Sequence, residues 1–470
     1  LARDAFPAYV EAAKRATEVI RLDDENVAGH AYLAYVDAIR WLEHGDPDAV
    51  RDEALKHVGD GRALGRHSHL LAAEAFLRHG AGDTAAAIAE LERLLEGDAQ
   101  SAVLQGVLGT LEMHSGDLDA AREVLGRAQK ASPGDVRIAE KLAEQYRRRG
   151  DGYELQASAF YDYALRLQKD HVPSILGKAL LLLERGQHEE AGKAAQLVLA
   201  PQTFASRRQL ALARMIRGSA LHAAKKPQEG SAEEAKALEL DPQNADLAHL
   251  LGQRKLREGD AAGAVDAFQR ALSVDSRRVA FYADLTRALL RTEGGAPKAI
   301  DTLKKAVTRL GESPRLALLL GDSYRAAGDG DLARWQYEKA IQLGRPFPDA
   351  RVALAKLLRA QNNVPGALVE LTQAIDEYGT SGSGGAARAF VEMAETERSR
   401  GARPQVLLEL YEKALGRDPA SCEALWGAGK LELDGAGRIT DRARDRLTSF
   451  ARLCPRSANA AEAARLVGAR

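Results

Sequence analysis

Few residues in this chain have the types and spacing that catalysis needs. The sequence has no GxxxxGK(S/T) phosphate loop, no HExxH zinc helix and no GxSxG nucleophile turn. His67 and His69 are the closest pair of histidines, but residues two apart on a helix point to different sides. Asp and Glu are plentiful, and on helices they mostly form solvated faces. We therefore expect no catalytic residue, no cofactor and no metal site.

The two cysteines, Cys422 and Cys454, are the remaining candidates for chemistry. They fall at the start of one expected helix and just after its antiparallel partner, so they could lie close in space. Cys422 has no plausible base near it in the sequence. We expect two small, partly buried thiols; a disulfide is the alternative, and it would require an oxidising compartment.

The charge balance and the apolar runs exclude two classes of partner. Lys plus Arg is 66 and Asp plus Glu is 67, which gives a formal net charge of -1. Proteins that bind nucleic acid usually carry a basic excess, so we expect no nucleic acid partner. The densest apolar run, residues 180–183, stops at Glu184 and is far shorter than the roughly 18 residues of a membrane span. We therefore expect no insertion into a membrane.

The elements that must position any site follow from a pattern that returns about every 34 residues along nearly the whole chain. One unit contains Leu108, Gly109, Ala121, Ala128 and Pro133. The same spacing returns in two later units, one with Leu251, Gly252, Ala264, Phe268, Ala271 and Ser276, the other with Leu320, Gly321, Tyr324, Ala333, Tyr337, Ala340 and Arg345.

With these positions the chain resembles the tetratricopeptide repeat (TPR) family, and its Ala-, Arg- and Gly-rich composition resembles that of bacterial multi-repeat scaffold proteins. The resemblance implies pairs of antiparallel helices that pack closely at small residues, with Pro133, Pro242 and Pro419 ending second helices. The family's tryptophan in the first helix is absent here. The implied fold is all-α: a right-handed α-solenoid superhelix of about twelve TPR-like helical hairpins.

We expect the array to fall into four segments. Residues 1–100 form degenerate TPR-like repeats, and residues 101–378 form the central array. Residues 379–385, GTSGSGG, form a flexible loop, which is either a long connection or a hinge between two sub-superhelices. Residues 386–470 form C-terminal repeats with a capping helix over 457–470. Residues 8–22 fit the second helix of a repeat without its first, so we expect more protein before Leu1.

The resemblance also implies that the first helix of each pair lines a concave groove. In the first half, the groove positions predict an exposed apolar patch, and such patches mark interaction sites. The alternative is that these side chains pack against neighbouring helices. The patch comprises Leu176, Leu180, Leu183, Leu212 and Met215.

In the second half, basic residues recur about once per repeat at or near the groove positions. Stacked repeats would align them as a basic ladder, and arginine grips carboxylates with two parallel hydrogen bonds. We therefore expect an acidic peptide or the acidic face of a partner protein; the alternative is a set of solvated helix C-termini. The ladder comprises Arg257, Arg287, Arg291, Arg325, Lys356 and Arg359.

We therefore expect a non-enzymatic scaffold or adaptor that binds a partner protein or peptide through its groove. By analogy with the family, its setting would be a bacterial multiprotein assembly such as envelope, pilus, secretion or motility machinery. The alternatives are a sensor or regulatory module of a larger signalling protein, and a helical-repeat protein that binds RNA. We expect a cytoplasmic location, with a periplasmic or envelope-associated one as the alternative.

Overall fold

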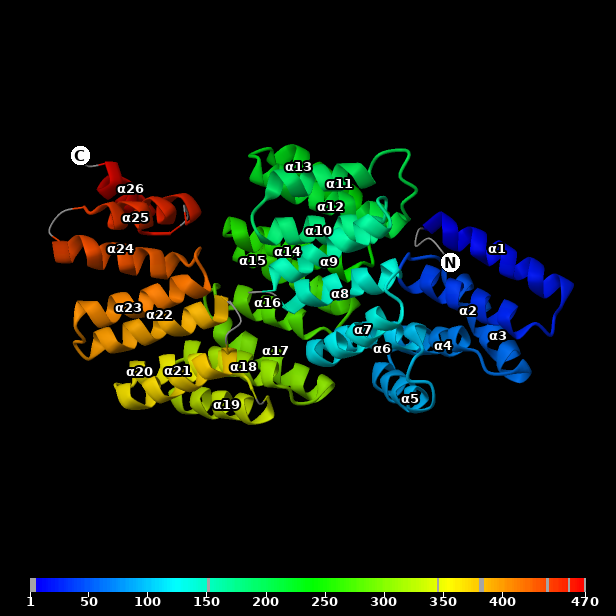
Figure 1. The fold of residues 1–470 in the computed structure, drawn as a ribbon, viewed down its shortest axis with the longest axis horizontal. Coiled ribbons are helices and arrows are strands. Elements are labelled where there is room, and N and C mark those ends of the chain that lie inside the picture. Colours follow the sequence, from blue (N-terminus) through cyan, green and yellow to red (C-terminus); the bar gives the residue numbers. More distant parts are fainter. Residues whose placement is uncertain are drawn as a thin grey trace. The chain divides into compact units, whose positions relative to one another are not determined.

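The computed structural model describes residues 6–149, 153–344, 346–379, 384–436, 439–454 and 457–468. Within these ranges the chain forms 26 helices and no strand (Figure 1). The expected all-α solenoid is therefore confirmed. The chain divides into two compact units, Leu1–Asp284 and Leu285–Arg470, and the division falls inside one helix. The right-handed twist of the superhelix stays a prediction.

Unit 1 consists of helices that pack in sequence order as antiparallel pairs after a single first helix. The packed pairs include α2 with α3, α6 with α7 and α14 with α15. The helices are α1 (Phe6–Leu22), α2 (Val27–Leu42), α3 (Asp48–Leu64), α4 (Ser68–Gly80), α5 (Thr84–Gly97), α6 (Ala102–Ser115), α7 (Leu118–Ala131), α8 (Val136–Arg149), α9 (Glu154–Leu167), α10 (Val172–Glu184), α11 (His188–Val198), α12 (Arg207–Ala223), α13 (Pro227–Leu240), α14 (Ala245–Glu258), α15 (Ala261–Val274) and the start of α16 (Val279–Leu289).

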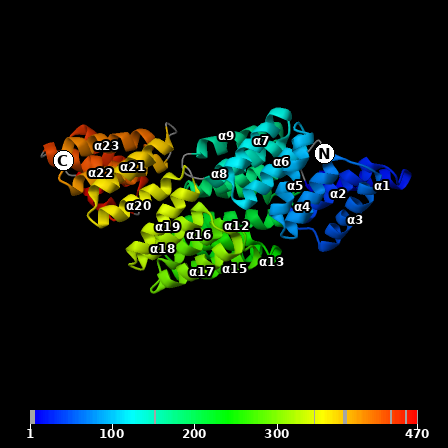
Figure 2. The ribbon, with the colours of Figure 1, turned by 90° about the horizontal axis from the view of Figure 1, so that it is seen from below.

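Unit 2 continues the same arrangement and ends in a single helix. Successive helices from α17 to α26 pack on one another, and Figure 2 shows α20 to α23 side by side. The helices are α17 (Gly295–Leu310), α18 (Pro314–Ala326), α19 (Gly330–Leu343), α20 (Pro348–Ala360), α21 (Val364–Tyr378), α22 (Gly384–Ser399), α23 (Pro404–Arg417), α24 (Cys422–Ala436), α25 (Asp441–Leu453) and α26 (Ala460–Gly468).

Small residues allow the two helices of a pair to approach closely. In the α6–α7 pair, Leu125 of α7 lies directly against Gly109 of α6, where a Cβ would be 2.5 Å from Leu125 Cγ. Ala121 and Ala128 of α7 are fully buried on the same face. A helix with its buried residues three and four apart presents one apolar stripe to its partner. The repeated small residues of the sequence are therefore helix-crossing points.

The turn inside a pair uses a recurring Gly–Asp step. Gly116 ends α6 with a φ of 96°, a left-handed conformation that glycine adopts without strain. Asp117 then accepts a hydrogen bond from the backbone N–H of Ala120, at 2.9 Å, and caps α7. Asp260 and Asp329 cap α15 and α19 in the same way. This step ends one helix and starts the next without an intervening loop.

A disulfide joins the two ends of the α24–α25 pair near the C-terminal end of unit 2. Cys422, the first residue of α24, and Cys454, which follows α25, form a disulfide with a Cα–Cα distance of 6.0 Å. The expectation of two partly buried thiols was wrong, because the two cysteines come close enough to bond, which their spacing in the sequence does not determine. Helix α26 then packs on α25, at the place where a capping helix was expected.

The predicted loop 379–385 lies partly outside the described residues, which omit 380–383, as they omit Arg345 and residues 469–470. Helix α22 begins at Gly384, so the last two residues of the predicted loop, Gly384 and Gly385, belong to a helix. Across this connection, Leu371 and Ala374 of α21 share an apolar cluster with Ala389 of α22. The core of unit 2 therefore continues past the connection.

Two glycine substitutions in the α6–α7 pair test the packing. Gly109→Ala places a methyl group against Leu125, so we expect a loss of about 1–3 kcal/mol in the free energy of unfolding. Gly126→Ala, on α7 with no atom within 4 Å of the added Cβ, should gain roughly 0.5–1 kcal/mol. Urea unfolding followed by circular dichroism measures both. Equal effects from the two substitutions would contradict close packing at Gly109.

Candidate functional site

The predicted apolar patch is not a surface feature. Leu176, Leu183 and Met215 expose only 3%, 4% and 0% of their surface. Leu180 and Leu212 are partly buried and pack against the apolar cluster that contains Leu176 and Leu183. The prediction of an exposed patch was therefore wrong. The physical reason is that consecutive residues of a helix differ by about 100° in direction, so a small error of register turns groove positions into core positions.

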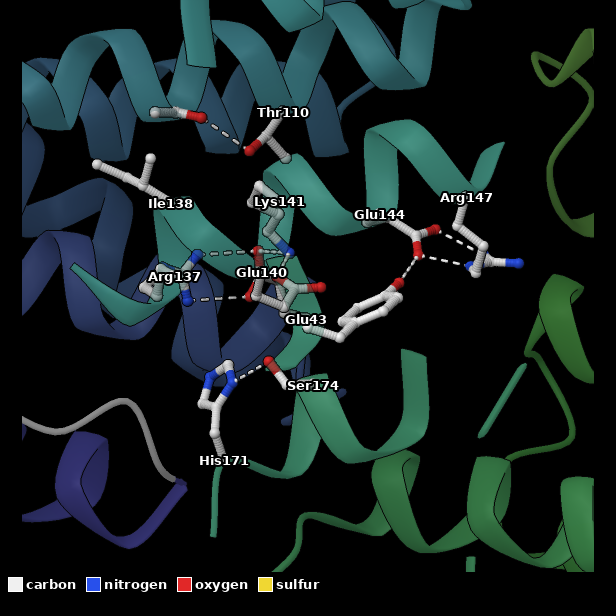
Figure 3. A network of polar contacts seen from close by, with 12 residues as sticks. Glu43, Thr110, Arg137, Ile138, Glu140, Lys141, Glu144, Arg147, His171 and Ser174 are labelled. Carbon is white, nitrogen blue, oxygen red and sulfur yellow. Dashed lines mark hydrogen bonds and ion pairs between the residues drawn. The ribbon is translucent and has the colours of Figure 1, made fainter. Parts of the chain in front are cut away.

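The inward charges of unit 1 are instead paired with one another, first at the end of α2 (Figure 3). Glu43, which follows α2, accepts hydrogen bonds from Arg137 of α8 at 3.1 and 3.0 Å. Arg137 also donates to the Tyr9 hydroxyl at 2.9 Å. Lys141, one turn later on α8, lies 3.6 Å from Glu43 and 3.2 Å from Glu140. We call Glu43, Arg137, Glu140 and Lys141 the Glu43 cluster.

The Glu43 cluster changes the ionisation of its carboxylate. Burial alone would raise the pKa of Glu43, but the charges of Arg137 and Lys141 and the hydrogen bonds from Arg137 lower it to about 2. The pKa of Lys141 is raised, because the charges of Glu140 and Glu43 outweigh the effect of its burial. Both groups therefore stay charged over the physiological range.

Further along α8, a second set of paired charges surrounds Glu144. Its carboxylate accepts hydrogen bonds from Arg147 at 2.7 Å, from Arg148 at 2.6 Å and from the Tyr161 hydroxyl at 2.9 Å. Arg147 also pairs with Glu184 of α10. Burial opposes ionisation of Glu144, but the two arginines hold its pKa well below the usual range.

Long side chains from later repeats also reach the N-terminal helices of unit 1. Arg208 of α12 donates to the backbone carbonyl of Leu42 at 2.6 Å, across 166 residues of sequence. Arg277, just before α16, donates to the carbonyl of His79 at 3.0 Å, across 198 residues. The helix C-termini that accept these bonds carry partial negative charge, which favours a cation. These contacts, like those of Glu43 and Glu144, join parts of unit 1 that are far apart in the sequence or on neighbouring helices.

Unit 2 presents its predicted basic residues on successive first helices. Arg325 lies on α18, while Lys356 and Arg359 lie on α20. Lys356 Nζ lies 2.8 Å from one oxygen of Glu392, and Arg359 lies 3.0 Å from the other. One carboxylate thus serves two cations, and the Lys356 side chain keeps 43% of its surface exposed.

Asp322 of α18 is the other carboxylate among these cations. Its pKa is raised by burial, against a hydrogen bond from the Tyr337 hydroxyl at 2.8 Å and the charges of Arg325, Arg315 and Lys356. Arg325 also lines an open cavity of about 740 Å³ with Leu357 and Gln361. We call the surface formed by Arg315, Arg325, Lys356 and Arg359 the basic face of unit 2.

The remaining ladder residues are exposed but divided between the units. Arg287 lies on α16 and Arg291 follows it, both in unit 2, whereas Arg257 of α14 belongs to unit 1. Arg257 lies near Glu184, whose pKa is raised by burial against the charges of Arg147 and Arg257. The structure therefore brings together the α18 and α20 members of the ladder within one unit.

Two segments of the chain, residues 78–144 and 318–383, match sequence models of the tetratricopeptide repeat. Tetratricopeptide repeat protein 36 of Mus musculus is 32% identical over 126 residues, which are 26% of this chain and 62% of that protein. The chain therefore spans less than two thirds of that relative's length. The chain therefore contains two stretches that match the tetratricopeptide repeat, as the spacing of its small residues predicts.

One solved structure supports the fold. The crystal structure of yeast Tom70 is similar to this chain with a TM-score of 0.53 and 16% identity, over 93% of this chain and 94% of that one. The Cut9–Hcn1 hetero-tetramer of the APC/C aligns with a TM-score of 0.36 and 14% identity, over 98% and 93%. The tetratricopeptide repeats support the general role of a protein–protein interaction scaffold. Among the described residues, no helix is long and apolar enough to cross a bilayer.

The Glu43 cluster generates a prediction about stability. Glu43→Gln leaves Arg137 and Lys141 without their carboxylate, so we expect unit 1 to lose about 3 kcal/mol of unfolding free energy at pH 7. Because the folded pKa of about 2 lies below the ordinary glutamate pKa of 4.5, this contribution is complete above pH 4.5 and is lost as the pH falls toward 2. The difference between the wild type and Glu43→Gln should therefore shrink over that window.

Trp41 fluorescence, in a background where Trp335 and Trp426 are phenylalanine, reports urea unfolding next to the cluster. Glu189→Gln is the matched control, because Glu189 pairs with Lys193 on an exposed surface. It should change stability by less than about 1 kcal/mol. A Glu43→Gln effect no larger than that of the control would contradict the role of the cluster.

Proposed function

We propose that this protein is a non-enzymatic scaffold that binds an acidic segment of a partner protein on the basic face of unit 2. The observation that carries this proposal is the shared carboxylate, because Lys356 and Arg359 divide the single charge of Glu392 between them. Two carboxylates, Asp322 and Glu392, lie among the four cations of this face, so a partner carboxylate that reached Lys356 or Arg325 would meet an excess of positive charge. Arg315, which is exposed at the start of α18, extends the same surface.

The comparison with unit 1 supports this choice of surface. There, Arg137 and Lys141 keep only 17% and 19% of their side-chain surface and already contact Glu43. A partner would have to displace these contacts and pay the desolvation of the groups left behind. The basic face of unit 2 needs no such exchange, because Lys356 is open to solvent while it contacts Glu392.

The setting that we propose is a multiprotein assembly, with the bacterial envelope, pilus, secretion and motility machines as the classes that the composition favours. Within this setting we propose a periplasmic or envelope-associated location rather than a cytoplasmic one. The disulfide between Cys422 and Cys454 supports this, since such bonds persist in oxidising compartments and are rare in the cytosol.

Alkylation of the protein isolated from its native source tests the disulfide and the location together. We expect iodoacetamide to leave the mass unchanged until the protein is reduced, after which two groups add to Cys422 and Cys454. Reduction should also lower stability at the C-terminal end by about 2–4 kcal/mol, which Trp426 reports from beside this bond. Labelling of both cysteines without reduction would contradict the proposed compartment.

A fluorescein-labelled polyglutamate peptide is the probe for the basic face. Arg325→Gln with Lys356→Gln removes two exposed cations but keeps Arg359 as the partner of Glu392. We expect this variant to bind the peptide about tenfold more weakly than the wild type, because each lost contact joins two charged groups. Fluorescence anisotropy at several salt concentrations measures the affinity.

The matched control is Lys305→Gln with Arg334→Gln, which removes two cations from the exposed faces of α17 and α19 in the same unit. It should leave the affinity unchanged; equal weakening by both variants would reduce the binding to non-specific attraction and contradict the proposal. Tight, salt-sensitive binding of a single-stranded RNA to the wild type would favour the RNA-binding alternative instead.

A further inference from the structure

Two histidines face each other inside the first complete helix pair of unit 1. His30 of α2 and His57 of α3 approach with their Nδ1 atoms 3.0 Å apart. Their ring centroids are 5.1 Å apart and the rings are tilted by 48°. His30 is buried, with 4% of its surface exposed. Neither residue belongs to the Glu43 cluster or to the basic face of unit 2.

The hydrogen bond of His30 on its other side fixes which nitrogen carries its proton. His30 Nε2 lies 3.0 Å from the backbone carbonyl oxygen of Asp24. A carbonyl oxygen only accepts, so Nε2 carries the hydrogen of the neutral ring and Nδ1 presents a bare lone pair. Histidines that bind metals show this arrangement, in which the second nitrogen donates to a carbonyl or carboxylate.

Carboxylates on α3 complete the surroundings of His57. Glu53, His57 and Asp60 are spaced four and three residues apart, so they share one face of the helix. One nitrogen of each histidine and one carboxylate oxygen of Asp60 lie within 4.8 Å of one another. Glu53 lies on the other side of the ring, with its oxygen 3.9 Å from His57 Nε2. A proton on Nε2, facing Glu53, leaves two Nδ1 lone pairs pointing at each other.

We propose that His30, His57 and Asp60 form a binding site for a divalent transition-metal ion of the Zn²⁺ class. Two imidazole nitrogens and one carboxylate oxygen are the donor set that such ions prefer, and water would take the fourth position. With Zn–N bonds of about 2.0–2.1 Å, two nitrogens of a tetrahedral site lie roughly 3.3 Å apart, so the rings need to move only by tenths of an ångström.

The position of the site on α3 favours binding. Asp60 is exposed, so an ion can reach the site from solvent. The bound ion would join α2 to α3 and fasten the N-terminal pair of the solenoid.

The alternative structure is a direct hydrogen bond in which His57 Nδ1–H donates to His30 Nδ1 without an ion. The two cases differ in what the full chain does with added metal. The chain, free of any histidine tag and treated with EDTA, is titrated with Zn²⁺ in a calorimeter. We expect one saturable site, and with Co²⁺ an absorption band in the visible range that is typical of a nitrogen- and oxygen-bound ion.

Variants assign the site to its residues. His57→Gln should abolish saturable Zn²⁺ binding and the Co²⁺ band, and Asp60→Asn, an exposed change that leaves the helix intact, should weaken Zn²⁺ affinity at least tenfold. His67→Gln is the matched control, because His67 lies in the same unit but outside the proposed metal site. This variant should bind Zn²⁺ as the wild type does.

Circular dichroism of each variant confirms that the helices remain. Absence of saturable Zn²⁺ binding in the wild type would overturn the proposal in favour of the hydrogen bond. So would binding that survives Asp60→Asn and His57→Gln unchanged, because the ion would then sit elsewhere. If His57→Gln fails to fold, Asp60→Asn still decides, since Asp60 lies on the exposed face of α3.

Discussion

The close crossing of paired helices is the constraint on which the rest of this structure depends. At several crossings, a large side chain of the second helix lies against the backbone of the first, where only a small residue fits. Leu125 meets Gly109 in this way, and Tyr337 meets Gly321, where a Cβ would lie 2.4 Å from the ring. Burial is thereby completed within a pair and its neighbours, as it is in other solenoids, and no single central core is needed.

This local mode of burial leaves long charged side chains on the first helices, and the two units use them differently. In unit 1 they form contacts between parts of the chain that are far apart in sequence, such as Glu43 with Arg137 across 94 residues. Those pairs stabilise a particular arrangement of the repeats. In unit 2, Lys356 and Arg359 share one carboxylate and keep contact with solvent. The same types of charged side chain therefore stabilise the fold in unit 1 and, by our proposal, bind a partner in unit 2.

The sequence predicts the helix pairs well because their signal is local. Gly109, Ala121 and Ala128 lie within one repeat, and their spacing alone indicates where two helices cross. The apolar patch failed because Leu176 and Met215 occupy positions whose burial depends on the rotation of each helix against the next, which the spacing does not determine. The sequence indicated that Cys422 and Cys454 could lie close together, but it did not determine whether they form a disulfide.

Contacts between distant repeats were beyond the reach of sequence reasoning. The approach of Arg137 to Glu43 depends on how several stacked pairs curve, and small rotations at each step add up over the distance. His30 and His57 are a different case, because they are 27 residues apart and belong to one pair. The sequence analysis considered His67 and His69 instead, because these two histidines are only two residues apart. Comparing residues that face each other across an expected helix pair would have revealed the first two.

The exposure of the cations determines whether an ion pair stabilises the fold or leaves its cation able to contact a partner. A buried pair is costly to break, because removing one partner leaves an uncompensated charge away from water. An exposed pair contributes little, roughly 0–1 kcal/mol, because water already solvates both groups. Lys356, at 43% exposure, can accept a second carboxylate without leaving Glu392, whereas Lys141, at 19%, already lies between Glu43 and Glu140. By our proposal, the basic face of unit 2 is the binding surface because its cations outnumber the carboxylates of the chain that lie among them.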